Sequence, residues 1–264
     1  MANTNRNTLC LFFILTFSLT WGLVGLLIFF TDSVEKLFGE VSASNPLFML
    51  AVYAPAISSL FLIWATYGKN GVIRFLHRLF MWRMGVGWWS FLIFGIPFIF
   101  YLGAFFKGAN HSYFPFESWS QALPALMLAF FLGPIEELGW RGLALPLLQK
   151  IMLPIWAGLV LGVIWAIWHI PAFLMSGAPQ SGWSFSAFFI GVVALSVILT
   201  PIFNESRGSL FIAYLYHFQM MNPIWPDAQP YDSYLLVMVA LVTVWLKRAS
   251  LFSSDSAVKD VLAK

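Results

Sequence analysis

Long apolar runs without a charged side chain recur through most of the 264-residue sequence, and they constrain the fold more than any other feature. A bilayer core about 30 Å thick is crossed by about 20 apolar helical residues. Four uncharged runs are close to that length, at 8–30, 46–66, 88–106 and 185–203. Of all residues, 60% are hydrophobic and only 9% are charged, whereas about 25% are charged in ordinary soluble domains. The sequence therefore predicts an integral membrane protein.

Four further stretches, also mainly apolar, lie at 122–149, 152–175, 208–225 and 230–246. The first two of them contain ionisable residues, and the last two are shorter and broken by prolines. Strands are not expected, because open sheet edges are not tolerated in lipid and no alternating ten-residue segments occur. We predict an all-α polytopic bundle of about eight transmembrane helices, which forms one transmembrane domain over 1–264 and ends in a short polar cytoplasmic tail at 249–264.

The distribution of lysine and arginine predicts the orientation of this bundle. If both termini are cytoplasmic, the inner segments hold eleven of these residues and the outer loops hold two, Lys36 and Lys107. Because basic loops stay on the cytoplasmic side, we expect eight crossings of the cell membrane with both ends inside. The basic residues form no tract of the kind that binds nucleic acid, so no nucleic-acid partner is expected. A single cysteine, Cys10, excludes a disulfide framework.

Three charged residues interrupt the apolar stretch at 122–149: Glu136, Glu137 and Arg141. Each such ion near the bilayer centre costs about 2.5–3.5 kcal/mol on insertion scales. Glu137 and Arg141 are four positions apart, so they share a helix face and can form an ion pair that stabilises the bundle. Glu136 lies about 100° away from Glu137 around the helix, and the same arginine cannot easily neutralise it. Glu136 is therefore the candidate functional carboxylate.

Pro134, just before these charges, predicts an irregular helix. It removes a backbone donor, and a kink there leaves carbonyl groups near Phe130 in need of partners. Since irregular backbone in a membrane is tolerated where it lines a buried or wet cavity, water is expected near Glu136. His169 and His217 lie in later apolar stretches. One such histidine alone is explained by hydrogen-bonded packing, but a carboxylate and two imidazoles together are suited to activating water.

This pattern resembles the CAAX protease and bacteriocin-processing (CPBP) family of intramembrane endopeptidases. The first motif of that family, a pair of glutamates followed by an arginine, is matched by Glu136, Glu137 and Arg141. Its second motif is an aromatic residue four positions before a histidine. Trp165 and His169 match it, with tryptophan where the family usually has phenylalanine.

The third motif of the family is commonly a histidine followed four positions later by asparagine or another small polar residue. His217 is present, but Met221 occupies the fourth position and Asn222 follows it. The resemblance covers about residues 120–225, which form the motif-bearing core of the predicted domain. It implies a helical membrane protease, and the three motifs occur in order on apolar stretches.

The resemblance also implies a mechanism. Glu136 and His169 would activate the attacking water, while His217 and an amide partner would stabilise the tetrahedral oxyanion. With Met221 at the usual position of that partner, Asn222 or Gln219 would substitute for it if the helix is distorted before Pro223. The substrate would be a peptide or protein, including one associated with the membrane. Two cofactor states stay open: a metal-free mechanism, which we favour slightly, and a zinc ion held by Glu136, His169 and His217, since two histidines and a glutamate form a known catalytic zinc set.

Two other classes of protein compete with the enzyme. A non-catalytic membrane binding or immunity protein of the same fold is favoured by the departure at Met221 and disfavoured by the presence of Glu136, His169 and His217. A secondary transporter also uses buried glutamate and histidine, but it predicts repeated halves with matching broken helices. The sequence has no such repeat.

Overall fold

The computed structural model describes residues 2–109 and 115–263, and within these ranges the chain forms helices and no strands. The α-helices are α1 (Ala2–Phe29), α2 (Thr31–Phe38), α3 (Pro46–Val52), α4 (Ala54–His77), α5 (Val86–Ser90), α6 (Ile96–Phe106), α7 (Trp119–Leu132), α8 (Glu137–Gly139), α9 (Leu145–Leu148), α10 (Pro154–Trp168), α11 (Ile170–Leu174), α12 (Phe185–Glu205), α13 (Leu210–Met220), α14 (Tyr231–Leu246) and α15 (Arg248–Leu251). Short 3-10 turns are η1 (Arg78–Phe80), η3 (Pro134–Glu136) and η5 (Pro179–Gly182), and π-helical turns are η2 (Phe91–Gly95) and η4 (Trp140–Ala144). The all-α prediction is confirmed.

The lengths of these helices bear on the number of membrane crossings. Among the described residues, five helical segments are long and apolar enough to cross a membrane, and six if α3 and α4, which are bent by 56°, are counted as one span. Helices also occupy the last two predicted stretches, but α13 has 11 residues and α14 has 16. Both are shorter than the roughly 20 residues of a full crossing. The count of eight crossings and the cytoplasmic location of the termini therefore stay predictions.

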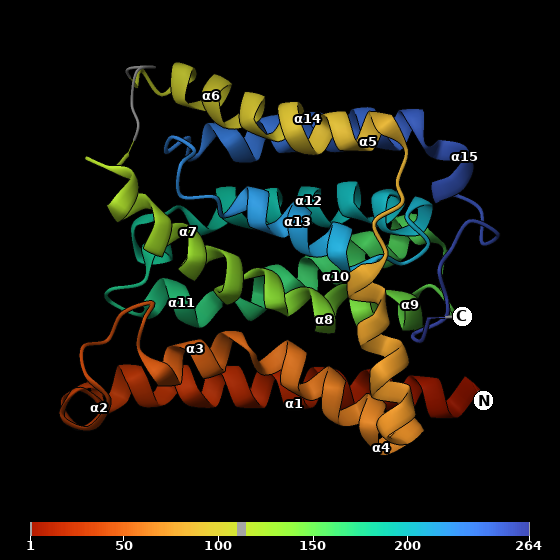
Figure 1. Cartoon of the computed structure of the whole chain (residues 1–264), viewed down its shortest axis with the longest axis horizontal. Helices are drawn as coiled ribbons and strands as arrows, with labels where there is room; N and C mark the ends of the chain where they lie inside the picture. Colours follow the sequence, from red (N-terminus) through yellow and green to blue (C-terminus); the bar gives the residue numbers. More distant parts are fainter. Residues whose placement is uncertain (1, 110–114, 264) are drawn as a thin grey trace.

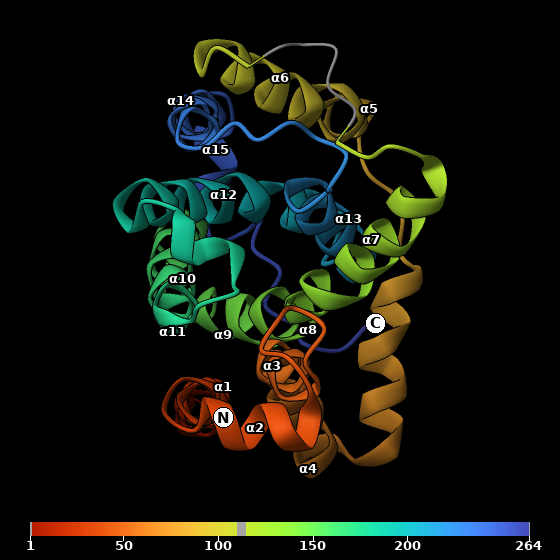
Figure 2. The ribbon, with the colours of Figure 1, turned by 90° about the vertical axis from the view of Figure 1, so that its left-hand side faces the viewer.

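The long helices run side by side along the longest axis of the molecule, and both ends of the chain lie at the same end of the bundle (Figure 1). Viewed along that axis, α1 and α3 lie on one side, α6 and α14 lie on the opposite side, and α7, α10, α12 and α13 lie between them (Figure 2). Gly68 has a positive φ of 65° and interrupts α4. After it, the second part of α4 runs across the long helices rather than along them (Figure 1).

Small residues let the central helices α10 and α12 pack closely. A Cβ atom added to Gly162 would lie 2.9 Å from the Ser196 Cβ, and one added to Gly158 would lie 2.5 Å from the Thr200 Oγ1. Ser196 Oγ donates a hydrogen bond of 2.8 Å to the Gly158 carbonyl. Small residues spaced by four positions and serine hydrogen bonds are typical of close helix contacts in membranes. This contact fixes α10, the helix that leads to His169.

The C-terminal segment is packed against the bundle. Gln149 Nε2 donates a 2.9 Å hydrogen bond to the Val258 carbonyl, and Arg78 Nη1 donates one of 3.0 Å to the Val261 carbonyl. Arg78 is itself buried and Val261 is 5% exposed. The described part of the stretch that we predicted as a polar tail thus closes the end of the bundle that carries the termini.

Candidate active site

The helix that leads to Glu136 is broken before it reaches that residue. α7 ends at Leu132, and Pro134 begins a 3-10 turn. Because proline cannot bond to the carbonyl four residues earlier, the Phe130 carbonyl needs another donor, and it accepts the hydroxyl of Tyr214. The break predicted at Pro134 is confirmed, and a tyrosine hydroxyl bonds to the freed carbonyl.

Replacement of Tyr214 by phenylalanine is expected to lower the free energy of unfolding by about 1–3 kcal/mol, the usual cost of leaving a buried polar group without its partner. Denaturant unfolding in detergent measures this change. Tyr234→Phe is the matched control, because Tyr234 is 50% exposed on α14. An unfolding free energy unchanged in the Tyr214 variant, relative to that control, would contradict the proposed role of its hydroxyl.

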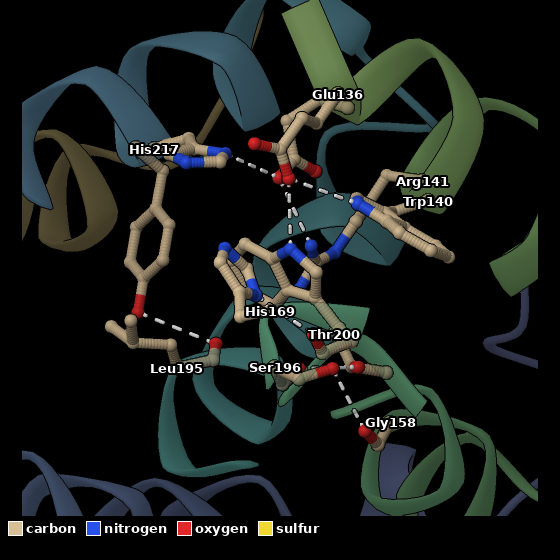
Figure 3. A network of polar contacts seen from close by, with 12 residues as sticks. Glu136, Trp140, Arg141, Gly158, His169, Leu195, Ser196, Thr200 and His217 are labelled. Carbon is tan, nitrogen blue, oxygen red and sulfur yellow. Dashed lines mark hydrogen bonds and ion pairs between the residues drawn. The ribbon is translucent and has the colours of Figure 1, made fainter. Parts of the chain in front are cut away.

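Glu136 is buried, with 3% of its surface exposed, and it interacts with indole groups rather than with an arginine. Trp140 Nε1 donates to Glu136 Oε2 at 3.1 Å (Figure 3), and Trp165 Nε1 donates to the same oxygen at 2.9 Å. Hydrogen bonds to an ionised group are stronger than those between neutral groups. Two converging donors therefore offset part of the cost of burying this carboxylate.

Glu137 binds two partners at once. Its Oε1 accepts from Arg141 Nη1 at 3.0 Å, and the side chains of both residues are fully buried. The ion pair predicted from their spacing is thus present. The same oxygen also lies 2.9 Å from His217 Nδ1. Glu137 therefore connects the ion pair to one of the candidate histidines, a contact that the sequence-based argument did not include.

His169 lies at the end of α10, and its ring orientation is fixed by the backbone. The Nδ1 atom lies 2.8 Å from the Trp165 carbonyl. Since a carbonyl can only accept, Nδ1 carries the hydrogen, and Nε2 of a neutral ring is left with a free lone pair. The ring also packs edge-on against Trp168, at 4.7 Å between ring centroids.

The candidate residues share one cavity of ≈ 580 Å³. Glu136, His169 and His217 all contribute to its wall, and so does Asn222. The rest of the lining is largely apolar and comes from α1, α3, α6, α7, α10, α11, α12, α13 and α14 and from the segment that joins α13 to α14. The structure thus brings together, around one hollow in the bundle, the three residues that were singled out from the sequence.

The regular helix that carries His217 ends just before Met221, the position at which the sequence differs from the third motif. α13 ends at Met220, and Asn222 lies beyond its last turn. Asn222 Nδ2 donates to Gln219 Oε1 at 3.1 Å, and its Oδ1 accepts from the Ile224 backbone N–H at 3.2 Å. The amide is therefore held at the cavity wall without occupying the fourth position after His217.

Gly133 has no side chain, and this leaves room for the side chains of Met221 and His217. A Cβ atom at this position would lie 2.0 Å from the Met221 Sδ and 3.4 Å from the His217 Nε2. Met221 thus packs against the backbone just before Pro134. His217 Nε2, the ring nitrogen that does not face Glu137, lies beside the same backbone.

The geometry does not favour the zinc alternative. Across residues 2–109 and 115–263, no group of three or more His, Cys, Asp or Glu side chains is placed to hold a metal ion. Glu136, His169 and His217 share a cavity but do not form a ligand set of that kind.

Two residues of this region were not singled out from the sequence, namely Trp140 and Tyr214. Trp140 could have been found, because it follows Glu136 by four positions, the same spacing that predicted the pairing of Glu137 with Arg141. Tyr214 contacts a residue 84 positions away. No local spacing gives a contact at that separation.

Two comparisons with known proteins identify similar sequences. Residues 118–221 match the family model described as type II CAAX prenyl endopeptidase Rce1-like. The chain is also 25% identical over 264 residues to CAAX prenyl protease 2 of Methanococcus maripaludis, an alignment that covers 92% of this chain and 95% of the relative. The matched region contains the cavity residues Glu136, His169 and His217. These similarities, together with the long apolar helices, identify the chain as a multi-pass membrane protease that is similar to the Rce1-like CAAX prenyl endopeptidases.

Proposed function

We propose that this intramembrane endopeptidase hydrolyses its peptide bond with a water molecule activated by Glu136 and His169, while His217 and Asn222 bind the oxyanion. One observation carries the proposal: the carboxylate, both imidazoles and the amide line a single cavity within the helical bundle. These groups supply a base and hydrogen-bond donors, the two components that hydrolysis of an amide requires.

The geometry supports a role for His169 as a base. Its Nδ1 hydrogen is held by the Trp165 carbonyl, so Nε2 can accept a proton. Glu136 is a second acceptor in the same cavity. Water placed between them would lose a proton as it attacks the carbonyl carbon. The same proton would then be delivered to the leaving amine, which completes the hydrolysis.

The contacts of His217 support a role in oxyanion binding. Its Nδ1 lies 2.9 Å from the Glu137 carboxylate, and this contact orients the ring. When the ring carries a hydrogen on Nε2, that N–H is a donor. Asn222 uses one amide hydrogen on Gln219 and keeps the second. Oriented donors in a site sheltered from water stabilise a developing oxyanion more strongly than donors in bulk water.

The first substrate to test is a prenylated CAAX peptide, because the relative from Methanococcus maripaludis is named a CAAX prenyl protease. The cavity is compatible with such a ligand. Its lining is mostly apolar, with side chains such as Leu128, Leu132 and Leu195, and its volume is ≈ 580 Å³. An apolar lining with a few polar groups is typical of small-molecule and lipid-like ligand sites.

A His169→Asn variant is expected to hydrolyse a fluorogenic prenylated CAAX peptide with kcat about 10²–10⁴-fold lower, the usual contribution of a positioned acid or base. The assay uses purified protein in detergent or liposomes, and mass spectrometry identifies the cleaved bond. His77→Asn is the matched control, because His77 is exposed and remote from the cavity.

Two results would contradict the proposed function. The first is a folded wild-type protein that cleaves neither prenylated nor unprenylated peptides from a library. The second is a His169→Asn variant with the activity of the His77→Asn control. A chelator added to the same assay tests metal dependence separately.

A further inference from the structure

Trp165 lies at the centre of the cavity residues. It is 4% exposed, and its indole N–H points at Glu136, 2.9 Å away. A phenylalanine at this position would pack in a similar way, but it has no hydrogen to donate. The tryptophan therefore adds a hydrogen bond at a site where an aromatic ring alone would fill the space.

The two indole donors act on one oxygen of the carboxylate. Both Trp140 Nε1 and Trp165 Nε1 donate to Glu136 Oε2, at 3.1 Å and 2.9 Å. These two bonds fix the plane of the Glu136 carboxylate. They leave its other oxygen, Oε1, able to accept a hydrogen bond from a group inside the cavity. Two donors from different helices restrain a side chain much more than one, because they remove its torsional freedom.

The ring of Trp165 is itself held on several sides. The Arg141 guanidinium lies 4.6 Å from its centroid, in cation–π geometry. The His217 ring contacts it edge-on at 5.2 Å, and the His169 ring lies at 5.8 Å. Each contact fixes the indole with respect to a different part of the cavity wall. Trp165 thus touches the carboxylate and both histidines of the proposed mechanism.

We propose that Trp165, assisted by Trp140, is a positioning residue that holds Glu136 Oε2 so that Oε1 faces the attacking water. The inference rests on the proposed function and deepens it, because it identifies how the base is oriented. Trp165 takes no part in bond making. It acts through Glu136, and its N–H rather than its ring volume carries the effect.

The test separates the N–H from the ring. Trp165→Phe removes the donor and keeps an aromatic side chain, and incorporation of benzothienylalanine at position 165 replaces the N–H by sulfur with nearly the same shape. Both variants are expected to lower kcat for the fluorogenic peptide by about 10–100-fold, in line with the loss of outer-shell orienting groups at other sites. KM is expected to stay within about twofold, because the indole N–H makes no contact with substrate.

Trp88→Phe is the matched control. Trp88 Nε1 also donates to a carboxylate, that of Glu205 at 2.7 Å, but neither residue lines the cavity. The control is expected to retain the wild-type kcat. The inference is overturned if Trp165→Phe keeps the wild-type kcat. It is also overturned if the benzothienylalanine protein is as active as wild type, because ring volume alone would then suffice.

A spectroscopic measurement makes the test independent of turnover. The carboxylate stretching bands of Glu136 are isolated by subtracting the infrared spectrum of Glu136→Gln from that of the parent protein. These bands are expected to shift when the donor at position 165 is removed, and an unmoved band overturns the inference. If instead Glu136→Gln remains fully active while the bands do shift, the proposed function fails and the hydrogen-bonded arrangement stands.

Discussion

Glu136→Gln is expected to lower peptide hydrolysis by about 10²–10⁴-fold, the contribution of a general base, while the protein folds as well as the wild type. Glutamine has the same shape, and its amide oxygen can still accept the indole hydrogens of Trp140 and Trp165. It cannot take a proton from water at neutral pH. Turnover of the fluorogenic peptide and thermal unfolding in detergent measure the two effects.

Glu40→Gln provides the control for this prediction, because Glu40 is an exposed glutamate that does not line the cavity. It is expected to match the wild type in both measurements. A Glu136→Gln protein that retains activity would exclude Glu136 as the base. Equal losses of activity and of folded yield would indicate that Glu136 is mainly structural.

Glu137→Ala is expected to have the largest effect on stability, lowering the free energy of unfolding by about 3–5 kcal/mol, the typical cost of breaking a buried ion pair. Arg141 would be left as a fully buried cation without its carboxylate. His217 would lose the acceptor of its Nδ1 hydrogen at the same time, so activity should also fall. Denaturant unfolding in detergent gives the free energy.

Glu205→Ala is the comparison for that variant. Glu205 pairs with Lys247 at 2.6 Å, but each side chain is 34% exposed. Ion pairs at the surface contribute about 0–1 kcal/mol, so this variant should be only slightly destabilised. Similar unfolding free energies for the Glu137 and Glu205 variants would refute the structural role that we give to the buried pair.

Local spacing predicted the parts of the site that depend on one helix. The pairing of Glu137 with Arg141 follows from their separation by four positions, and the break at Pro134 follows from its missing N–H. The helices themselves followed from uncharged apolar runs. Such features depend on the period of the α-helix and on the length of a membrane crossing, which are the same in every sequence.

Contacts between distant helices could not be predicted in the same way. His217 bonds to Glu137 across 80 positions, and the relative rotation and depth of two helices decide which glutamate it meets. Spacing along one helix predicts Arg141 alone as the partner of Glu137. Spacing also gives no sign that Trp165 donates to Glu136, because an aromatic residue four positions before a histidine is explained by packing alone.

The contacts of residues 258–263 have a consequence for biogenesis. These residues follow every helix in the sequence, so they leave the ribosome after the last helix has been synthesised. The buried guanidinium of Arg78 donates a hydrogen bond to the Val261 carbonyl of this segment. Arg78 therefore lacks one of its acceptors until residues 258–263 have been synthesised and have packed against it.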